Sequence, residues 1–244
     1  MELSEDILKK GYWYYSPEKL HPPQGILLSE YAEETKVCLY QTKGGETAYQ
    51  INKREKSYTT EIPEKLQQVK TLWVSHINQN TFDSICELEN LEGLYVDSNN
   101  IKSIDNIKNL KYLKHLALLN LTKIDSLEPL EECDHLQTLK LENLKKIFLF
   151  NSVSKLINLK GLEIDGDMYT AQKIENFNFI SSLEKLQYLS LSKTKATVKD
   201  FTPISKLTQL ISFASSSNYP KKEFQKLNKL PLRYFGNVKE LIKN

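Results

Sequence analysis

The sequence is poor in the residues from which disulfide frameworks and thiolate metal sites are built. It holds 3 cysteines in 244 residues. They are Cys38, Cys86 and Cys133, which are widely spaced and include no C-x-x-C pair. An odd number at this spacing argues against a disulfide framework and against a zinc site made of thiolates. We expect each cysteine to be an ordinary reduced residue of the core or the surface.

An excess of charge of either sign is also missing. Lysine and arginine number 33 against 31 aspartates and glutamates, so no global field attracts nucleic acid or an anionic membrane. Residues 1–10 lack an apolar run of signal-peptide length, and no later segment is apolar for long enough to span a bilayer. The sequence therefore predicts a cytoplasmic protein that binds neither nucleic acid nor membrane.

The short motifs of common catalytic and cofactor sites are absent as well. The sequence has no G-x-x-x-x-G-K-S/T, no G-x-G-x-x-G, no G-x-S-x-G and no H-E-x-x-H, which mark phosphate, dinucleotide, acyl-transfer and zinc-hydrolase sites. The few histidines, His21, His76, His115 and His135, have no spacing that suits shared metal binding. We therefore expect no enzymatic activity, no metal and no cofactor.

What the sequence does contain is an internal repeat. The pattern L-x-x-L-x-L, or a close variant, recurs at steps of 22 to 27 residues, which is the period of a stacked repeat array. The cores begin at Val69, Leu91, Leu113, Leu136, Leu159, Leu186 and Leu210. An eighth, imperfect core begins at Leu232.

Each core alternates its side chains, which predicts a short strand with one buried face. Further apolar residues between the cores lie three apart, as in Ile101, Ile104 and Ile107, and this spacing suits a tight helical or 3-10 return. One turn cannot bury its own leucines, so the turns must stack into a continuous core. We therefore predict an α/β solenoid over residues 66–219, with a parallel concave sheet and short helical or 3-10 returns.

These repeats resemble the leucine-rich-repeat family, and within it the short 22-residue class found in a protein-phosphatase regulator and in bacterial internalins. The turn from Leu91 to Tyr112 matches that class almost position for position, and Asn99 stands at the place of the family's buried asparagine. Other turns carry different residues at that place, so no continuous asparagine ladder is expected. The resemblance implies the solenoid and a binding surface on its concave side, but it identifies no ligand.

A solenoid exposes its core at both ends, and each end needs a cap. Residues 1–65 are predicted to form a small N-terminal capping or accessory domain. Within it, Val37 to Tyr40 and Thr47 to Ile51 flank Lys43-Gly44-Gly45, which predicts a β-hairpin, and residues 57–62 suit a third strand. The aromatic cluster at residues 12–15 is interpreted as the hydrophobic plug of this domain, with a binding platform as the alternative.

Residues 220–244 are predicted to hold the last imperfect repeat and a C-terminal cap, with Val238, Leu241 and Ile242 at helical spacing. The basic residues of this segment are interpreted as a solvated surface rather than a phosphate site. The turn from Leu159 carries extra residues at 167–178, which should form a protruding loop or a longer helix. This insertion is interpreted as tolerated on the surface, with a functional loop as the alternative.

The strand register fixes which side chains face the concave side. Trp73 and Tyr95 are expected to stand side by side as exposed aromatic anchors of an interface. An acidic strip along the neighbouring turns would attract a basic partner. The competing interpretation is that the N-terminal domain or the insertion folds over the two rings. The candidate partner-binding residues are Trp73, Tyr95, Asp97, His115, Lys140, Glu142, Glu163, Asp165 and Tyr188.

Together these patterns predict a non-enzymatic protein-recognition module that binds a protein partner, of basic character, on its concave face. It would act as an inhibitor, an immunity protein or a regulatory scaffold. The alternative gives residues 1–65 an enzymatic or nucleic-acid-binding activity for which the repeats select the target. A secreted or surface adhesin is a third interpretation, which the missing export signal disfavours.

Overall fold

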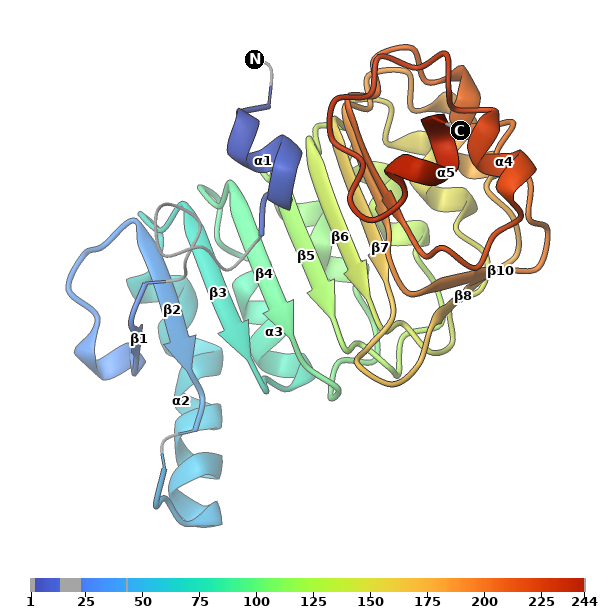
Figure 1. Cartoon of the computed structure of the whole chain (residues 1–244). Coiled ribbons are helices and arrows are strands. Elements are labelled where there is room, and N and C mark those ends of the chain that lie inside the picture. Colours follow the sequence, from blue (N-terminus) through green and yellow to red (C-terminus); the bar gives the residue numbers. More distant parts are fainter. Residues whose placement is uncertain (1–2, 14–22, 43, 244) are drawn as a thin grey trace.

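Parallel strands, one from each turn of the chain, form the main body of the molecule. The computed structural model describes residues 3–13, 23–42 and 44–243. Within them, a nine-stranded sheet runs in the order β1-β2-β3-β4-β5-β6-β7-β9-β11, and all its neighbouring strands are parallel (Figure 1). The strands are β1 (Gly25–Ile26), β2 (Lys36–Tyr40), β3 (Thr71–Ser75), β4 (Gly93–Asp97), β5 (His115–Leu119), β6 (Thr138–Glu142), β7 (Gly161–Asp165), β9 (Tyr188–Leu191) and β11 (Ser212–Ser215).

The pairing of these strands follows the repeat register of the sequence. Leu94 pairs with Leu72 in the turn before it and with Leu116 in the turn after it. Neighbouring strands lie about 4.8 Å apart, so equivalent leucines stack into rows that form one core across many turns. The leucines of this row are at most 1% exposed; they are Leu72, Leu94, Leu116, Leu139, Leu162 and Leu189.

The chain returns along the convex side in short helices, as the three-residue spacing predicted. A regular helix follows β3, and 3-10 helices serve the later turns. Ile104 and Ile107 of the second return are buried at 1% and 0% exposure. The returns are α3 (Gln79–Ile85), η2 (Asp105–Asn109), η3 (Glu128–Glu132), η4 (Asn151–Lys155), η5 (Asn178–Ser182) and η6 (Ile204–Lys206). The prediction of an α/β solenoid with short helical and 3-10 returns is thus confirmed.

The second turn departs from the family pattern at one residue. Asn99 is exposed, so the buried asparagine that the resemblance implied is wrong here. Ser98 is buried instead, at 2% exposure, and its hydroxyl donates a hydrogen bond of 2.6 Å to the carbonyl oxygen of Ile77. The polar contact to the preceding turn therefore comes from Ser98, while Asn99 faces solvent.

The predicted hairpin near residue 44 is also wrong. Only its first strand forms: β2 pairs in parallel with β1 on one side and β3 on the other. The second half lies in the helix α2 (Ala48–Lys65), which also contains the proposed third strand at 57–62. Thr47 and Gln50 cap this helix reciprocally, each side chain accepting a hydrogen bond from the other's backbone N–H, and this capping box starts a helix where the second strand was expected.

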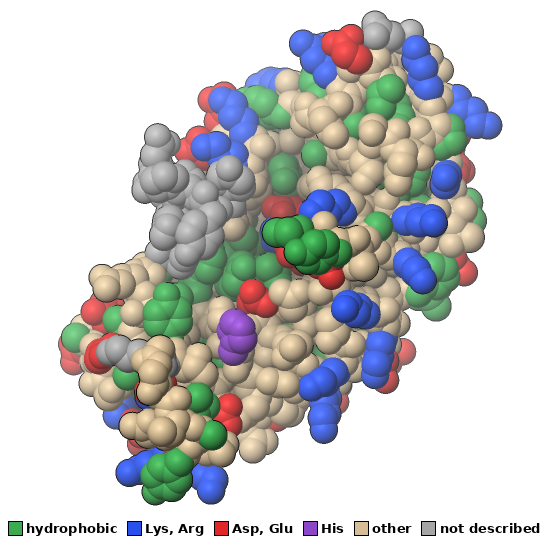
Figure 2. Space-filling view, turned by 60° about the horizontal axis from the view of Figure 1, so that its bottom comes forward, with side chains coloured by type: hydrophobic (Ala, Val, Ile, Leu, Met, Phe, Trp, Pro, Cys, Tyr) green, Lys and Arg blue, Asp and Glu red, His purple; other side chains and the backbone are tan. Residues whose placement is uncertain are grey.

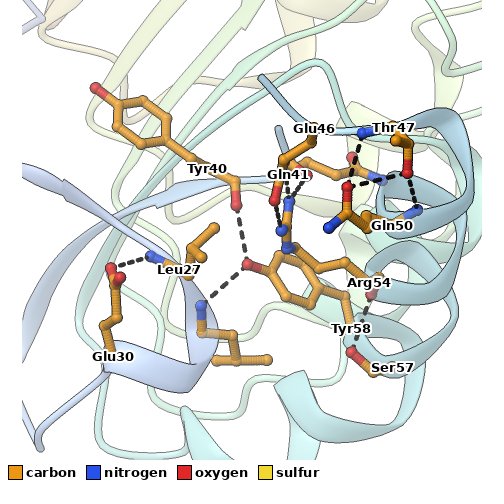
Figure 3. A network of polar contacts seen from close by, with 11 residues as sticks. Leu27, Glu30, Tyr40, Gln41, Glu46, Thr47, Gln50, Arg54, Ser57 and Tyr58 are labelled. Atoms are coloured by element: carbon orange, nitrogen blue, oxygen red, sulfur yellow. Dashed lines mark hydrogen bonds and ion pairs between the residues drawn. The ribbon is translucent and has the colours of Figure 1, made fainter. Parts of the chain in front are cut away.

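Polar contacts fasten α2 to the strands (Figure 3). The Tyr58 hydroxyl donates to the carbonyl oxygen of Tyr40 at 2.9 Å and accepts from the backbone N–H of Leu28 at 3.0 Å. Arg54, one helical turn earlier, donates to the carbonyl oxygen of Gln41 at 2.8 Å. One face of α2 therefore holds both the end of β2 and the start of the 3-10 helix η1 (Leu28–Glu30).

The insertion at 167–178 forms neither only a loop nor a longer helix, so that prediction is wrong in part. It contains β8 (Gln172–Ile174), which pairs in parallel with β10 (Thr194–Ala196) in a separate two-stranded sheet. The amide of Gln172 donates to the carbonyl oxygen of Ile147 at 2.9 Å and so joins the insertion to the turn before it. Met168 and Tyr169, ahead of β8, are 76% and 90% exposed.

Two short helices, α4 (Lys221–Gln225) and α5 (Lys239–Lys243), follow the last strand. An isolated parallel bridge joins Ser212 to Tyr234 in the imperfect eighth core. Val238 and Ile242 are buried at 0% and 3% exposure, as their helical spacing predicted. The domain boundaries at residues 65 and 219, and the capping roles of the two ends, stay predictions.

Cys86 and Cys133 are buried, Cys38 is half-buried, and all three are free thiols. Burial raises the pKa of all three thiols, which suits packing roles rather than reactivity. In the described parts of the chain no helix is both long and apolar enough to cross a membrane. Those parts also hold no group of three or more His, Cys, Asp or Glu residues that suits a metal ion.

Candidate functional site

The candidate residues lie on five adjacent strands, β3, β4, β5, β6 and β7, and on β9 beside them. The register pairs Trp73 with Tyr95 and Lys140 with Glu163 along one column. It pairs Glu142 with Asp165 along the next column. The structure therefore brings together the residues that the sequence placed on one face.

The aromatic end of this face is covered, which corrects the expectation that its rings are exposed. Trp73 is only 4% exposed. Its ring stacks on Tyr95 with centroids 4.4 Å apart, and Trp13 packs edge-on against it at 5.1 Å. Trp13 is itself 5% exposed. The competing interpretation, in which the N-terminal region folds over the rings, describes the structure.

The covering element is residues 3–13, which we call the arm. It contains the helix α1 (Glu5–Lys10), which lies in front of the concave sheet near the beginnings of β5 and β6 (Figure 1). After the helix, Tyr12 stacks on His115 with centroids 3.7 Å apart and planes inclined by 9°. Trp13 then continues into the slot beside Trp73 and Tyr95. The predicted plug at residues 12–15 thus packs on the repeats as far as residue 13, and Tyr14 and Tyr15 lie outside the described residues.

Glycines make room for the arm. Gly11 has a φ of +82° and turns the chain between α1 and the aromatic pair. A Cβ on Gly11 would overlap the carboxylate of Glu163, so any other residue there would be strained and would also collide. On the sheet, Gly93 lies opposite Trp13 and Gly161 opposite Leu3, where an added Cβ would be in ordinary van der Waals contact with the arm at 3.5 and 3.7 Å.

Polar contacts hold the beginning of the arm at the other side of the face. The backbone N–H of Leu3 donates to the side-chain oxygen of Gln187 at 3.2 Å. The Tyr234 hydroxyl donates to Glu5 at 2.8 Å, and the ammonium of Lys9 lies 5.5 Å from the centre of the Tyr234 ring. These contacts are mostly exposed, so they contribute little compared with the buried rings at the other end of the arm.

A charged cluster occupies the middle of the concave face. The Lys140 ammonium lies 3.3 Å from a carboxylate oxygen of Glu142 and 3.4 Å from one of Glu163. Burial raises the pKa of Glu163, and Lys140 partly offsets this. Burial and the repulsion of Glu142 raise the pKa of Asp165 to about 7. Two carboxylates therefore contact one ammonium, and the carboxyl group of Asp165 lies on the neighbouring strand with a raised pKa, so the cluster holds more carboxyl groups than cations.

Asp97 belongs to a different polar array from the one predicted. It accepts a hydrogen bond of 2.7 Å from the side-chain amide of Asn120, which in turn accepts one of 2.6 Å from Asn143. Both asparagines have positive φ, at 58° and 55°, a conformation that asparagine tolerates better than most residues. The sequence reasoning missed these two, although their recurrence 23 residues apart at the ends of neighbouring cores was a readable signal.

Figure 2 shows the hollow from the side of the strands' carboxyl ends, with acidic and hydrophobic side chains inside it and basic side chains gathered outside its rim. Tyr188 is 7% exposed and hydrogen-bonds Glu163. Burial lowers the pKa of His115 to about 4, with Lys114 adding to the effect. His115 is therefore neutral at pH 7, and its Nδ1 lies 2.9 Å from the hydroxyl oxygen of Thr138.

Comparison with known proteins gives a fold relationship. No family model matches the chain, and no curated protein matches it. The crystal structure of internalin C2 from Listeria monocytogenes is similar, with a TM-score of 0.53 and 20% identity over 71% of this chain and 73% of that one. An internalin inlF from the same species gives a TM-score of 0.42 and 22% identity over 70% of this chain and 62% of the other, too loose a likeness to support an argument. At 20% identity the first resemblance shows a shared architecture and leaves the ligand open.

Proposed function

We propose that this leucine-rich-repeat solenoid is a non-enzymatic protein-recognition module whose concave face binds a basic protein partner. Its finer role is that of an inhibitor, an immunity protein or a regulatory scaffold, acting in the cytoplasm and binding neither nucleic acid nor membrane. The assignment of the repeats to the 22-residue class is part of the same proposal.

The observation that carries this proposal is the surplus of carboxylates around Lys140. A folded chain gains nothing by holding Glu142 and Asp165 as neighbours on paired strands, because like charges that face each other are destabilising. A lysine or arginine of a partner placed between them would remove that repulsion and let both carboxyl groups ionise. The cluster therefore has the properties of a docking point for a cation.

The nine candidate residues divide by their accessibility. Asp97, Glu142 and Asp165 lie on a part of the face where the side chains are half-buried and reach solvent, so they can meet a partner directly. Trp73 and Tyr188, at 4% and 7% exposure, can do so only if the arm moves. We assign the open carboxylates to steering and first contact.

Binding measurements on charge-reversed variants test this function once the partner has been recovered by co-purification and mass spectrometry. The double variant Glu142→Lys/Asp165→Lys should lower the association rate and flatten its salt dependence, because these charges steer the approach. The matched control is Glu128→Lys/Glu131→Lys, which reverses two exposed carboxylates on the convex helix η3. Equal association rates for both double variants in surface plasmon resonance would place the interface elsewhere.

The alternative, an independent enzymatic or nucleic-acid-binding domain at 1–65, gains no support from the contacts. β2 pairs with β3 over five residues, and the hydroxyl of Ser84 on α3 donates to the carbonyl oxygen of Thr59 on α2 at 2.8 Å. Residues 23–65 thus share a sheet and a helix layer with the repeats. Such contacts suit a part of the solenoid better than a separate catalytic module.

A further inference from the structure

The arm occupies the face to which the proposed function assigns the partner. Its two aromatic side chains enter a slot that the sheet builds from β3, β4 and β5. Trp73, Ala117 and Leu119 form the floor of this slot and are at most 5% exposed with the arm in place. Tyr95 and Cys38 flank it. Without the arm, large apolar surfaces would face solvent side by side, a pattern typical of an interface rather than of a monomer's surface.

The arm is also a weakly built element. α1 has six residues, far fewer than the roughly 12–15 that an isolated helix needs in water. The arm forms hydrogen bonds with the side chains of Gln187 and Tyr234. It therefore adds no strand to the sheet in its described part. Elements held in this way open at a smaller free energy than the core to which they are attached.

We propose that the arm occupies the binding site of the partner and is displaced when the partner binds. A short segment of the partner, with two adjacent aromatic side chains, then takes the place of the arm over Trp73, Tyr95 and His115. This rests on the proposed function for the identity of the face. The partner is thus a protein that offers both a basic residue to the Glu142 and Asp165 cluster and an aromatic pair to the slot. Its apparent affinity is reduced by the fraction of molecules in which the arm is closed.

Gly11 provides a way to open the arm without altering the sheet. In the full-length chain, Gly11→Val places a branched side chain at a φ of +82° against the Glu163 carboxylate, so the arm can return only by straining its backbone and by displacing Glu163 from Lys140. Gly45→Val is the matched control, because Gly45 has a φ of +83° but no atom within 4 Å of its would-be Cβ. Both variants carry the same backbone strain, and only Gly11→Val disturbs the concave face.

The test uses a fluorescein-labelled peptide with the sequence of residues 3–13, LSEDILKKGYW, and fluorescence anisotropy. The peptide should bind the Gly11→Val chain at least tenfold more tightly than the Gly45→Val chain, because only the former has an empty slot. A peptide with Tyr12→Ala and Trp13→Ala should lose this binding. Equal affinity for the two chains, absence of binding to both, or undiminished binding of the alanine peptide would overturn the proposal.

A second opened chain guards against misfolding of the first. Tyr12→Ala/Trp13→Ala in the full-length chain removes the two plugging rings but leaves every sheet residue in place. It should bind the unaltered peptide as Gly11→Val does, and failure of both opened chains to bind while they melt cooperatively counts against the proposal. This experiment needs no partner, so its failure is distinguishable from failure of the proposed function, which the charge-reversed variants report.

Discussion

The two halves of the concave face differ in what the side chains of their central column contact. On β3, β4 and β5 the central column reads Trp73, Tyr95 and Ala117, and the arm covers it. On β6 and β7 the same column reads Lys140 and Glu163, and charges pair within the sheet. The arm covers the charged half only in part: Gly11 lies against Glu163, whereas Glu142 and Asp165 are half-buried and reach solvent. The comparison separates an apolar surface that the arm covers from a charged surface that stays partly accessible.

The two halves should respond alike to substitutions in the leucine core beneath the concave face. Leu116 lies beneath the aromatic half and Leu139 beneath the charged half, at 0% and 1% exposure. Leu116→Ala and Leu139→Ala should each lower the free energy of unfolding by about 2–5 kcal/mol, since both leave a cavity in the shared core. Urea unfolding measures this, with Ile157→Ala as a control, because Ile157 is 54% exposed. A large effect in only one half would mean that the core is not continuous.

The aromatic half should respond to a ring deletion as a packed core does. Trp73→Ala should lower the free energy of unfolding by about 2–3 kcal/mol, less than in a closed core because the arm can shift into the space. It should also raise the accessibility of Trp13 to a fluorescence quencher such as iodide. If the melt is unchanged and Trp13 stays protected, the ring of Trp73 does not hold the arm.

The sequence predicted the repeated layer, but it left open whether the N-terminal region covers Trp73 and Tyr95, and this has a physical reason. Leucines at a fixed period encode contacts between equivalent residues of neighbouring turns, so register and burial follow from counting. The contact of Trp13 with Trp73 spans 60 residues and belongs to no period. The aromatic residues near position 13 and on the concave strands each indicated an apolar surface, but they did not indicate that the first set covers the second. The concave position of the site could be predicted, whereas its accessibility could not.

Local signals misled in two other places. Gly44 and Gly45 suggested a hairpin, yet the capping box of Thr47 and Gln50 begins a helix only two residues later, and the buried Tyr58 and Ile62 lie four residues apart on its inner face. In the insertion, β8 has three residues and becomes a strand only because β10 lies beside it. Such pairing is a property of the stack rather than of the segment.

The carboxyl groups of the charged half should make the free energy of unfolding depend on pH. The pKa of Asp165 is raised from 3.8 to about 7 in the folded chain, so its contribution to stability is full below about pH 4 and is lost as the pH rises to about 7. Asp165→Asn removes this loss, so the variant should melt roughly 2–4 °C above the parent at pH 8, which corresponds to about 1 kcal/mol of unfolding free energy. The expected gain is kept this small because the partial solvent exposure of Asp165 weakens the effect.

Thermal melts at pH 5 and pH 8 check this expectation. Asp125→Asn is the control, because Asp125 is exposed and lies outside the strands of the concave sheet, so its replacement should leave the difference between the two pH values unchanged. A variant Asp165→Asn that is less stable than the parent at pH 8 would show that the carboxylate is favourably paired, and the surplus of negative charge would then be smaller than the geometry indicates.

The smallest effect, and the most local, concerns His115, where the two halves meet. The arm buries its ring under Tyr12 and lowers its pKa from 6.5 to about 4, an effect to which Lys114 adds and which Glu92 opposes. The neutral form of His115 therefore favours the closed arm fully above about pH 6.5, and this contribution to closure is lost as the pH falls through 4. In Gly11→Val the ring is uncovered, so NMR titration should return its pKa toward 6.5, while Gly45→Val should titrate like the parent. A His115→Gln spectrum assigns the resonance. A pKa near 4 in Gly11→Val would mean that the sheet, not the arm, keeps this histidine neutral, and the boundary between the covered and open halves would lie nearer to β3.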